Sequence, residues 1–270
     1  MLGVHTNYAS IVAQGAVNKS NNLLTNAMER LSTGLRINSA SDDAAGLQIA
    51  NRMSANVKGM ETASRNISDA TSMLQTADGA LEELTTIANR QKELATQASN
   101  GVNSADDLTA LNDEFTQLNA EITRIVENTT YAGNKLFDTG VLTSGTGVKF
   151  QIGAGTTETM DVKLGAIPKT VAGTLTGGTA NAAIALVDTF LAAVGTERST
   201  LGANINRLGH TAANLASVTE NTKAAAGRIM DADFAVESAN MTRNQLLVQA
   251  GTTVLSSANQ NTGLVMGLLR

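Results

Sequence analysis

Few residues of this 270-residue chain have the types and spacing that catalysis or ligand binding requires. The two histidines, His5 and His210, belong to no HExxH motif and have no nucleophile beside them, so we expect surface or packing roles. The chain has no cysteine, which excludes disulfides, thiolate metal sites and a cysteine nucleophile. Gly153-Ala154-Gly155 follows a predicted strand but lacks the third glycine and the helix of a dinucleotide site.

Acidic residues form the other candidate groups. Asp231, Asp233 and Glu237 are spaced loosely like calcium ligands, but the EF-hand glycine is absent, so we interpret them as helix caps and solvated positions. The acidic pairs are Asp42-Asp43, Glu82-Glu83 and Asp106-Asp107. Adjacent residues on a helix point apart, which does not suit a shared carboxylate site. We therefore expect no enzyme, no cofactor and no metal.

The composition restricts the partners. Hydrophobic residues make up 42% of the chain, enough to bury a core, but aromatic residues only 3%, which disfavours an enzyme pocket or a base-stacking surface. The net charge of −5 argues against a nucleic-acid partner. The first residues contain no basic leader, and no window approaches the roughly 18 uninterrupted apolar residues of a membrane span. We therefore expect no membrane partner and no cleaved signal peptide.

Two helices are predicted around a polar cluster at residues 38–43. The first carries a narrow, heptad-like apolar stripe, formed by Val17, Leu24, Met28, Leu31 and Leu35. Gly34 suits its end, and Ser39 or Ser41 suits the cap of the next helix. That helix is predicted over about 44–99, and its length is a reason to look for a long partner.

A second long helix follows after a turn. Asn100-Gly101 is a turn signal, and Ser104 with Asp107 forms a capping-box pattern for a helix over about 104–129. Two helices joined by so short a turn should run antiparallel.

The middle of the chain is rich in Gly and Thr. Apolar residues alternate with polar ones at Val148, Phe150 and Ile152 and again from Met160 to Leu164, which predicts a β-hairpin around the loop GAGTTE. The segment after Pro168 is a weaker strand or a loop.

Helix returns from about residue 180 and breaks near 229–231, where Asp231 or Asp233 can cap a last helix. Its predicted stripe comprises Leu247, Ala250, Val254, Ala258, Asn261, Val265 and Leu268. Both terminal stripes are too narrow to hold a globule alone. The terminal helices therefore either pair with each other as a coiled coil or become ordered against copies of the same chain.

The predicted fold is mainly α: a long antiparallel helical bundle or coiled coil formed by the N- and C-terminal halves, with a small β-hairpin region in the middle. The predicted segments are 1–43, an N-terminal inner helix with a connecting spoke; 44–138, the N-terminal outer helices; 139–180, the hairpin and variable segment; 181–230, the C-terminal outer helix; and 231–270, the C-terminal inner helix.

Four stretches carry a family resemblance. They are LSTGLRINSASDDAAGLQIANRM, RNISDATSMLQTADGALEE, YAGNKLFD and ADFAVESANMTRNQLLVQAGTTVLSSANQNTGLVMGLLR. All four resemble bacterial flagellin, and together the matching regions leave out only about 139–180. The resemblance implies an extracellular structural subunit that self-assembles into the helical flagellar filament for motility. The terminal helices would form the inner tube of that filament, and residues 38–43 the spoke to an outer layer.

The resemblance also implies sites and partners. The polymerisation residues of the inner tube would be Val17, Leu24, Met28, Leu31, Leu35, Leu247, Val254, Val265 and Leu268. The partners would be further copies of the chain, a flagellar export chaperone, the filament cap, hook–filament junction proteins and an innate immune flagellin receptor. Export would use the flagellar type III apparatus without a cleaved signal peptide.

The implied receptor contact lies in NRQKELATQ, at residues 89–97, and on the helix beside it. The matching residues are Arg90, Glu93, Leu94, Gln97 and Glu114. The segment 170–178 has no counterpart in these motifs, so we expect its deletion to leave assembly intact. A hook–filament junction protein of the same family and a secreted coiled-coil adhesin are the alternatives.

Overall fold

The computed structural model describes the backbone of residues 6–176 and 178–268, and the side chains of residues 6–176 and 178–260. Its helices are α1 (Tyr8–Thr33), α2 (Ala44–Ala98), α3 (Ala105–Asn128), α4 (Ala180–Met230) and α5 (Phe234–Leu268). Two small antiparallel hairpins pair β1 (Thr130–Tyr131) with β2 (Asn134–Lys135), and β3 (Val148–Gln151) with β4 (Thr159–Val162). The mainly α fold with a small central β region is thus confirmed.

The chain forms two compact units. The terminal unit contains the described residues up to Ala55 together with those from Asn221 onward, and the central unit contains Asn56–Glu220. The boundaries between these units lie within α2 and α4, so the first turns of α2 and the last turns of α4 belong to the terminal unit. The five segments expected from the sequence, with boundaries at 43/44 and 230/231, remain a prediction.

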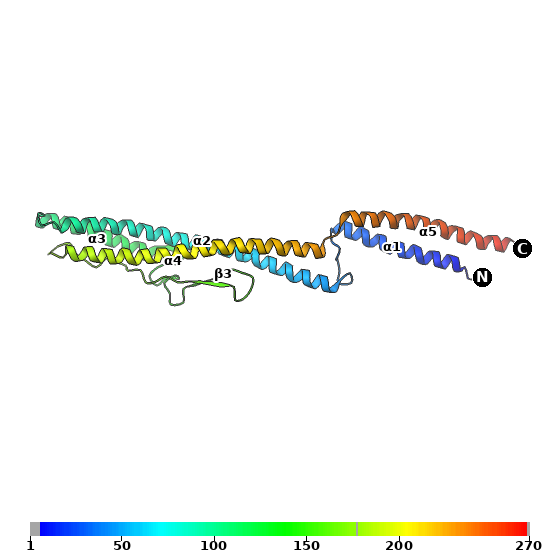
Figure 1. The fold of residues 1–270 in the computed structure, drawn as a ribbon, viewed down its shortest axis with the longest axis horizontal. Helices are drawn as coiled ribbons and strands as arrows, with labels where there is room; N and C mark the ends of the chain where they lie inside the picture. Colours follow the sequence, from blue (N-terminus) through cyan, green and yellow to red (C-terminus); the bar gives the residue numbers. More distant parts are fainter. Residues whose placement is uncertain (1–5, 177, 269–270) are drawn as a thin grey trace. The chain divides into compact units, whose positions relative to one another are not determined.

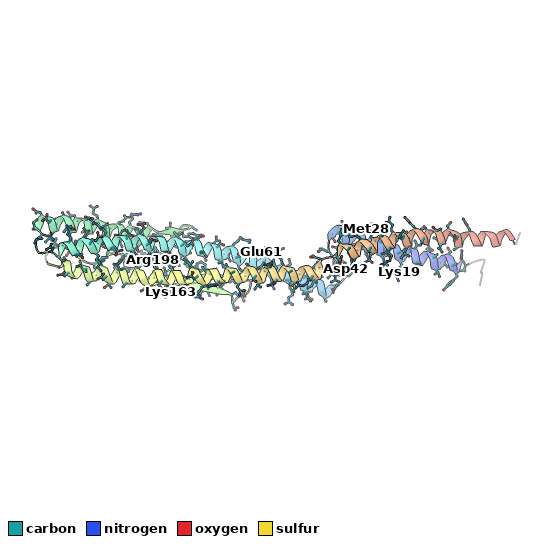
Figure 2. The ribbon with its side chains drawn as sticks, turned by 45° about the horizontal axis from the view of Figure 1, so that its top comes forward. Lys19, Met28, Asp42, Glu61, Lys163 and Arg198 are labelled. Carbon is teal, nitrogen blue, oxygen red and sulfur yellow. The ribbon has the colours of Figure 1, made fainter. Side chains whose placement is uncertain are left out.

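The central unit is built on three helices that lie side by side, α2, α3 and α4 (Figure 1). Its fully buried side chains include Leu74, Leu81, Leu84, Phe115, Ile122, Val187, Val194 and Leu201. With the other buried residues, such as Ala77 on α2 and Ala183 and Phe190 on α4, they recur mostly in steps of three and four, so each of these helices presents one apolar stripe to its neighbours. The long stripes predicted from the sequence are therefore the core of this unit. Outside the core, Arg198 (labelled in Figure 2) joins α4 to α2 through Asp78, with Nε 2.9 Å from Oδ1.

Among the described residues, α4 alone is long and apolar enough to cross a membrane by length and composition, with a window of mean hydropathy 1.2. Its large apolar side chains at Val187, Phe190 and Leu208 are buried within the central unit. Of that apolar window, 28% is buried inside the structure.

Helix caps agree with the sequence in two cases and differ in one. Ser104 and Asp107 form the predicted capping box at the start of α3, and Ser104 lowers the pKa of Asp107 by donating hydrogen bonds to its carboxylate. Asp233 caps α5, since its Oδ1 accepts from the amides of Ala235 and Val236. The cap of α2, however, is Asp43, whose Oδ1 accepts from Gly46 N at 2.8 Å, and not Ser39 or Ser41.

The segment after the β3–β4 hairpin is irregular but packed, which the sequence pattern did not indicate. Leu164, Ile167, Val171 and Leu175 are buried in the core of the central unit. The side chain of Asn119 on α3 holds Val171 at both backbone groups: Oδ1 accepts from its amide at 2.9 Å and Nδ2 donates to its carbonyl at 3.1 Å. The segment 170–178 thus contributes core side chains at Val171 and Leu175, and the expectation that its deletion leaves assembly intact stays a prediction.

A second feature that we did not predict is the β1–β2 hairpin in YAGN. Ala132 and Gly133 occupy its turn with φ of 48° and 83°. Two consecutive residues with positive φ are the geometry of a type I′ turn, which matches the twist of the paired strands.

Asn119→Ala should lower the free energy of unfolding of the central unit by about 1–2 kcal/mol, because the amide and carbonyl of Val171 lose their partners. Urea denaturation measures this, with Gln117→Ala, an exposed change on the same helix, as the control. We expect the control to stay within about 0.5 kcal/mol of the wild type. Equal stabilities of the two variants would contradict a stabilising role of the hydrogen bonds between the Asn119 side chain and the Val171 backbone.

Candidate assembly surfaces

In the terminal unit, α1 and α5 lie side by side along their lengths (Figure 1). The buried and half-buried positions of α1 on this side are Ser10, Ala13, Val17, Ser20, Leu24, Ala27 and Leu31. Those of α5 are Glu237, Met241, Asn244, Val248, Gly251, Leu255 and Ala258. Both series advance in alternating steps of three and four, the heptad spacing of a two-stranded coiled coil. The structure thus pairs the terminal helices with each other, one of the two arrangements that the sequence left open.

Small residues let the two backbones approach closely. A Cβ atom added to Gly251 would lie 2.5 Å from Val17 Cγ2, closer than carbon atoms tolerate. Toward the start of α1, Asn7 caps the helix by accepting from Ser10 N, and its Nδ2 donates to Ala258 O at 2.8 Å. One side chain therefore both begins α1 and attaches it to α5.

Polar contacts join the helices at their other end. Arg30 Nη1 lies 2.9 Å from Glu237 Oε1, and Glu237 is only 7% exposed. A buried carboxylate needs such a partner, so this pair selects one alignment of α1 against α5. The adjacent connections also pair with each other: Ala232 N donates to Gly34 O, and Arg36 N donates to Met230 O.

Asp42 organises the polar cluster between α1 and α2. Its Oδ2 accepts hydrogen bonds from the amides of Ser39 and Asn38, at 2.9 and 3.0 Å, and from the Ser39 hydroxyl. These bonds, with that from the Ser39 amide foremost, lower the pKa of Asp42 because they stabilise its charged form. The polar cluster at residues 38–43 is therefore a turn that is stabilised by the Asp42 carboxylate.

The predicted polymerisation residues fall on two different faces. Val17 is buried between α1 and α5, and Leu24, Leu31 and Leu35 are half-buried. Met28, labelled in Figure 2, is 47% exposed. On α5, Val248 and Leu255 face α1, whereas the predicted polymerisation residues Leu247 and Val254 are 49% and 58% exposed. The side chains of Val265 and Leu268 lie outside the described residues.

The exposed residues form a second apolar set on the terminal helices. On α1 it contains Tyr8, Ile11, Val12, Leu23 and Met28, and on α5 it contains Phe234, Val236, Leu246, Leu247 and Val254. We call this set the outer apolar residues. Sequence reasoning missed most of them, although their signal is present as further apolar positions beside the predicted stripes. Where exposed apolar residues adjoin one another, they are typical of an interaction surface.

The predicted receptor contact is mostly exposed. Arg90 forms ion pairs with Glu114 at 2.8 Å and Glu93 at 3.1 Å, and Gln97 is exposed. The hydrogen bond that Arg90 donates to the Glu114 carboxylate is the main reason that the pKa of Arg90 is raised. Leu94 is 1% exposed and packs in the core of the central unit, so its inclusion among the contact residues was wrong.

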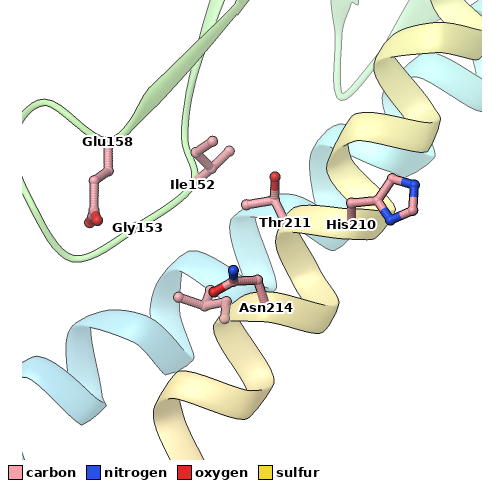
Figure 3. A pocket seen from close by; sticks show the side chains of 7 residues that line it. Ile152, Gly153, Glu158, His210, Thr211 and Asn214 are labelled. Carbon is pink, nitrogen blue, oxygen red and sulfur yellow. The ribbon is translucent and has the colours of Figure 1, made fainter.

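A cleft of about 420 Å³ lies between the β3–β4 loop and α4, with Glu158 on one side and His210, Thr211 and Asn214 on the other (Figure 3). Glu158 Oε2 accepts from Gly155 N at 2.6 Å, so this carboxylate holds the hairpin loop. Across the part of the chain that the structure describes, no three His, Cys, Asp or Glu residues gather to hold a metal ion. His5 lies outside the described residues.

Comparisons with known proteins cover nearly the whole chain. Residues 4–141 match the model of the bacterial flagellin N-terminal helical region, and residues 184–269 match that of the C-terminal helical region. A flagellin of Halalkalibacterium halodurans is 46% identical over 251 residues, covering 90% of this chain and 91% of the relative. The flagellar filament 33 kDa core protein of Treponema phagedenis is 34% identical over 99% of both chains.

A solved structure is also similar. The crystal structure of Bacillus cereus flagellin is 34% identical and has a TM-score of 0.50, over 56% of this chain and 88% of that one.

Gly251→Ala should weaken the α1–α5 pair, since overpacking costs about 1–3 kcal/mol and exceeds the gain in helix propensity. Gly15→Ala is the matched control on α1, where an added Cβ meets nothing within 4 Å. Hydrogen exchange of the α1 and α5 amides should be faster in the first variant and unchanged or slower in the second. Equal protection in both variants, or no protection in the wild type, would contradict the pairing.

Acid should loosen the turn at residues 38–42. A carboxyl group whose pKa is lowered by folding stabilises the fold above its unfolded pKa, and this contribution disappears as the pH falls through the folded pKa. In an NMR titration, the amide signals of Asn38 and Ser39 should shift together with a midpoint below that of an ordinary aspartate. Asp42→Asn should abolish the shift. A midpoint at or above the ordinary value would rule out the turn described here.

Proposed function

This chain belongs to the bacterial flagellin family and is a structural subunit of the flagellar filament; from that premise we propose that the outer apolar residues of α1 and α5 are where copies of the chain join. The observation that carries this proposal is that pairing uses only part of the apolar surface of the terminal helices. One stripe of each helix is used within the chain, between Val17 and Gly251 and their neighbours. Outside that stripe, Leu247 and Val254 at its edge and the other outer apolar residues have large exposed apolar side chains.

The two faces have separate tasks in this proposal. The inner face, with the Arg30–Glu237 pair, aligns α1 with α5 inside one subunit. The outer apolar residues then meet different patches on neighbouring copies, and such head-to-tail contacts build a helical filament when they do not close into a ring. Burial of apolar area on assembly drives the polymerisation. We therefore assign Leu247, Val254 and Met28 to contacts between subunits, and Val17, Leu24 and Leu31 to the pairing that precedes them.

Other partners follow from the same surface. A flagellar export chaperone would cover the apolar residues of α5 before assembly, and the filament cap and hook–filament junction proteins would meet the same helices at the ends of the filament. Export would proceed without a cleaved signal peptide. The innate immune receptor contact is reduced to Arg90, Glu93, Gln97 and Glu114, since Leu94 is buried.

Val254→Asp tests the assignment of the outer face. Burying an unpaired carboxylate costs about 3 kcal/mol or more, and each 1.4 kcal/mol is tenfold, so the critical concentration for polymerisation should rise at least roughly a hundredfold. Sedimentation and electron microscopy of the full chain, after addition of kosmotropic salt or filament seeds, measure it. Val254→Leu, which keeps an apolar side chain, should still polymerise.

Hydrogen exchange of the same variants distinguishes residues that act within one subunit from residues that act between subunits. Val254→Asp should leave the α1–α5 pair protected, whereas Leu31→Asp, at a half-buried position on the inner face, should expose it and also block assembly. Normal filaments from Val254→Asp would overturn the assignment. Loss of α1–α5 protection in that variant would show that Val254 acts within the subunit instead.

A further inference from the structure

The turn between α2 and α3 contains the one Asn-Gly pair of the sequence, Asn100-Gly101. Both residues are exposed, and the turn spans only the residues between Ala98 and Ala105. We propose that this turn modifies itself: Asn100 is a site of spontaneous deamidation to aspartate and isoaspartate. The proposal does not depend on the proposed function.

The reaction needs no catalyst or oxidant. The backbone nitrogen of Gly101, after losing its proton to solvent base, attacks Cγ of Asn100, so an N–Cγ bond forms and the Cγ–Nδ2 bond breaks. The side-chain nitrogen takes up a proton and leaves as ammonia, and a five-membered succinimide remains. Water then opens the ring at either carbonyl, which gives aspartate or isoaspartate.

The structure leaves the reacting groups of this pair free. No hydrogen bond is formed by the Asn100 side-chain amide or by the Gly101 amide within the part of the chain that the structure describes. The bonds that hold the Asn100 backbone are long: its amide donates to Gln97 O at 3.2 Å, and its carbonyl accepts from Asn103 N at 3.3 Å. Gly101 also lacks the Cβ that would restrict the backbone as the nitrogen turns toward Cγ.

The same turn contains a second Asn pair, Asn103-Ser104, whose reacting groups form hydrogen bonds and which therefore serves as a control. Asn103 is followed by Ser104, another small residue, but its Nδ2 donates to Gln97 O at 2.6 Å. The Ser104 amide donates to Asp107 Oδ2 at 2.9 Å within the capping box of α3. Both the leaving group and the attacking nitrogen of this second pair are therefore engaged. The turn places a free pair and a restrained pair three residues apart.

The product would change the end of α2. A carboxylate at residue 100 adds negative charge at the C-terminal end of a helix, where the helix dipole disfavours it. It would also lie beside Lys92 and Glu93 in the shallow surface cleft that Asn100 lines. An isoaspartate would in addition lengthen the backbone of the turn by one methylene group.

The experiment is incubation of the folded full chain in mildly alkaline buffer, followed by trypsin digestion and mass spectrometry. One peptide, from Glu93 to Arg124, contains both asparagines, so their conversion is compared within a single molecule. Fragmentation locates the mass gained when the amide becomes a carboxyl. Asn100 should convert at least roughly tenfold faster than Asn103, and a protein isoaspartate methyltransferase should label the product at residue 100.

The matched variant is Gly101→Ala. An added Cβ at this position meets nothing within 4 Å, so the fold should be unchanged. Its conversion at Asn100 should fall roughly tenfold, which corresponds to about 1.4 kcal/mol of barrier. In denaturant the hydrogen bonds of Asn103 are lost, and the difference between the two asparagines should narrow.

Three results would overturn the proposal: equal conversion of Asn100 and Asn103 in the folded chain, no slowing in Gly101→Ala, or the absence of isoaspartate at residue 100 after prolonged incubation.

Discussion

Two helices packed against each other can each cover only one side of the other, and the terminal unit depends on this constraint. A three-helix core such as that of the central unit surrounds its apolar side chains, so Leu81, Phe115 and Leu201 are fully buried there. In the α1–α5 pair the contact is one narrow stripe on each helix, where small or polar residues such as Ala13, Gly251 and Asn244 alternate with larger apolar ones such as Val17 and Leu255. Further large apolar side chains, among them Leu247 and Val254, remain exposed.

The narrow contact also explains the use of polar residues at the interface. An apolar stripe that repeats every seven residues has little to distinguish one alignment of the two helices from another that is shifted by one repeat. Glu237 with Arg30 can be satisfied in one alignment only, and Asn7 with Ala258 restrains the other end. Such pairs add specificity more than stability, as polar residues at core positions of coiled coils do. Burial of the apolar stripe thus brings the two helices together, and the polar contacts align them.

Much of the fold could be predicted from the sequence because long helices leave strong periodic signals. The predicted α2 and α3 agree with the structure to within a residue or two, and the capping box at Ser104 was found from its spacing alone. The segment around Val171 gave no such signal, since it is held by backbone hydrogen bonds to Asn119 and by scattered side chains, and neither has a period.

The candidate site was harder to predict, because α5 has two neighbouring apolar series. Leu247 and Val254 belong to one, and Val248 and Leu255 to the other, so hydrophobicity alone does not select the face that meets α1. What selects it is Gly251, where a missing side chain permits close approach, and Glu237, where a charge needs its partner. Leu94 was included in the receptor contact through the family resemblance of residues 89–97, whereas its burial shows that it belongs to the apolar stripe of α2.

The pairing of the first helix with the last also sets an order of events during synthesis. Asn7 and Ala258 are separated by 251 positions, and Arg30 and Glu237 by 207. The helix that leaves the ribosome first therefore has no partner within the chain until nearly all the rest has been made, whereas α2 and α3 can meet as soon as their short turn emerges. An isolated helix with so narrow a stripe is marginal in water. The central core is complete once α4 has been made, and α1 still lacks its partner at that point, because α5 is made last of the five helices.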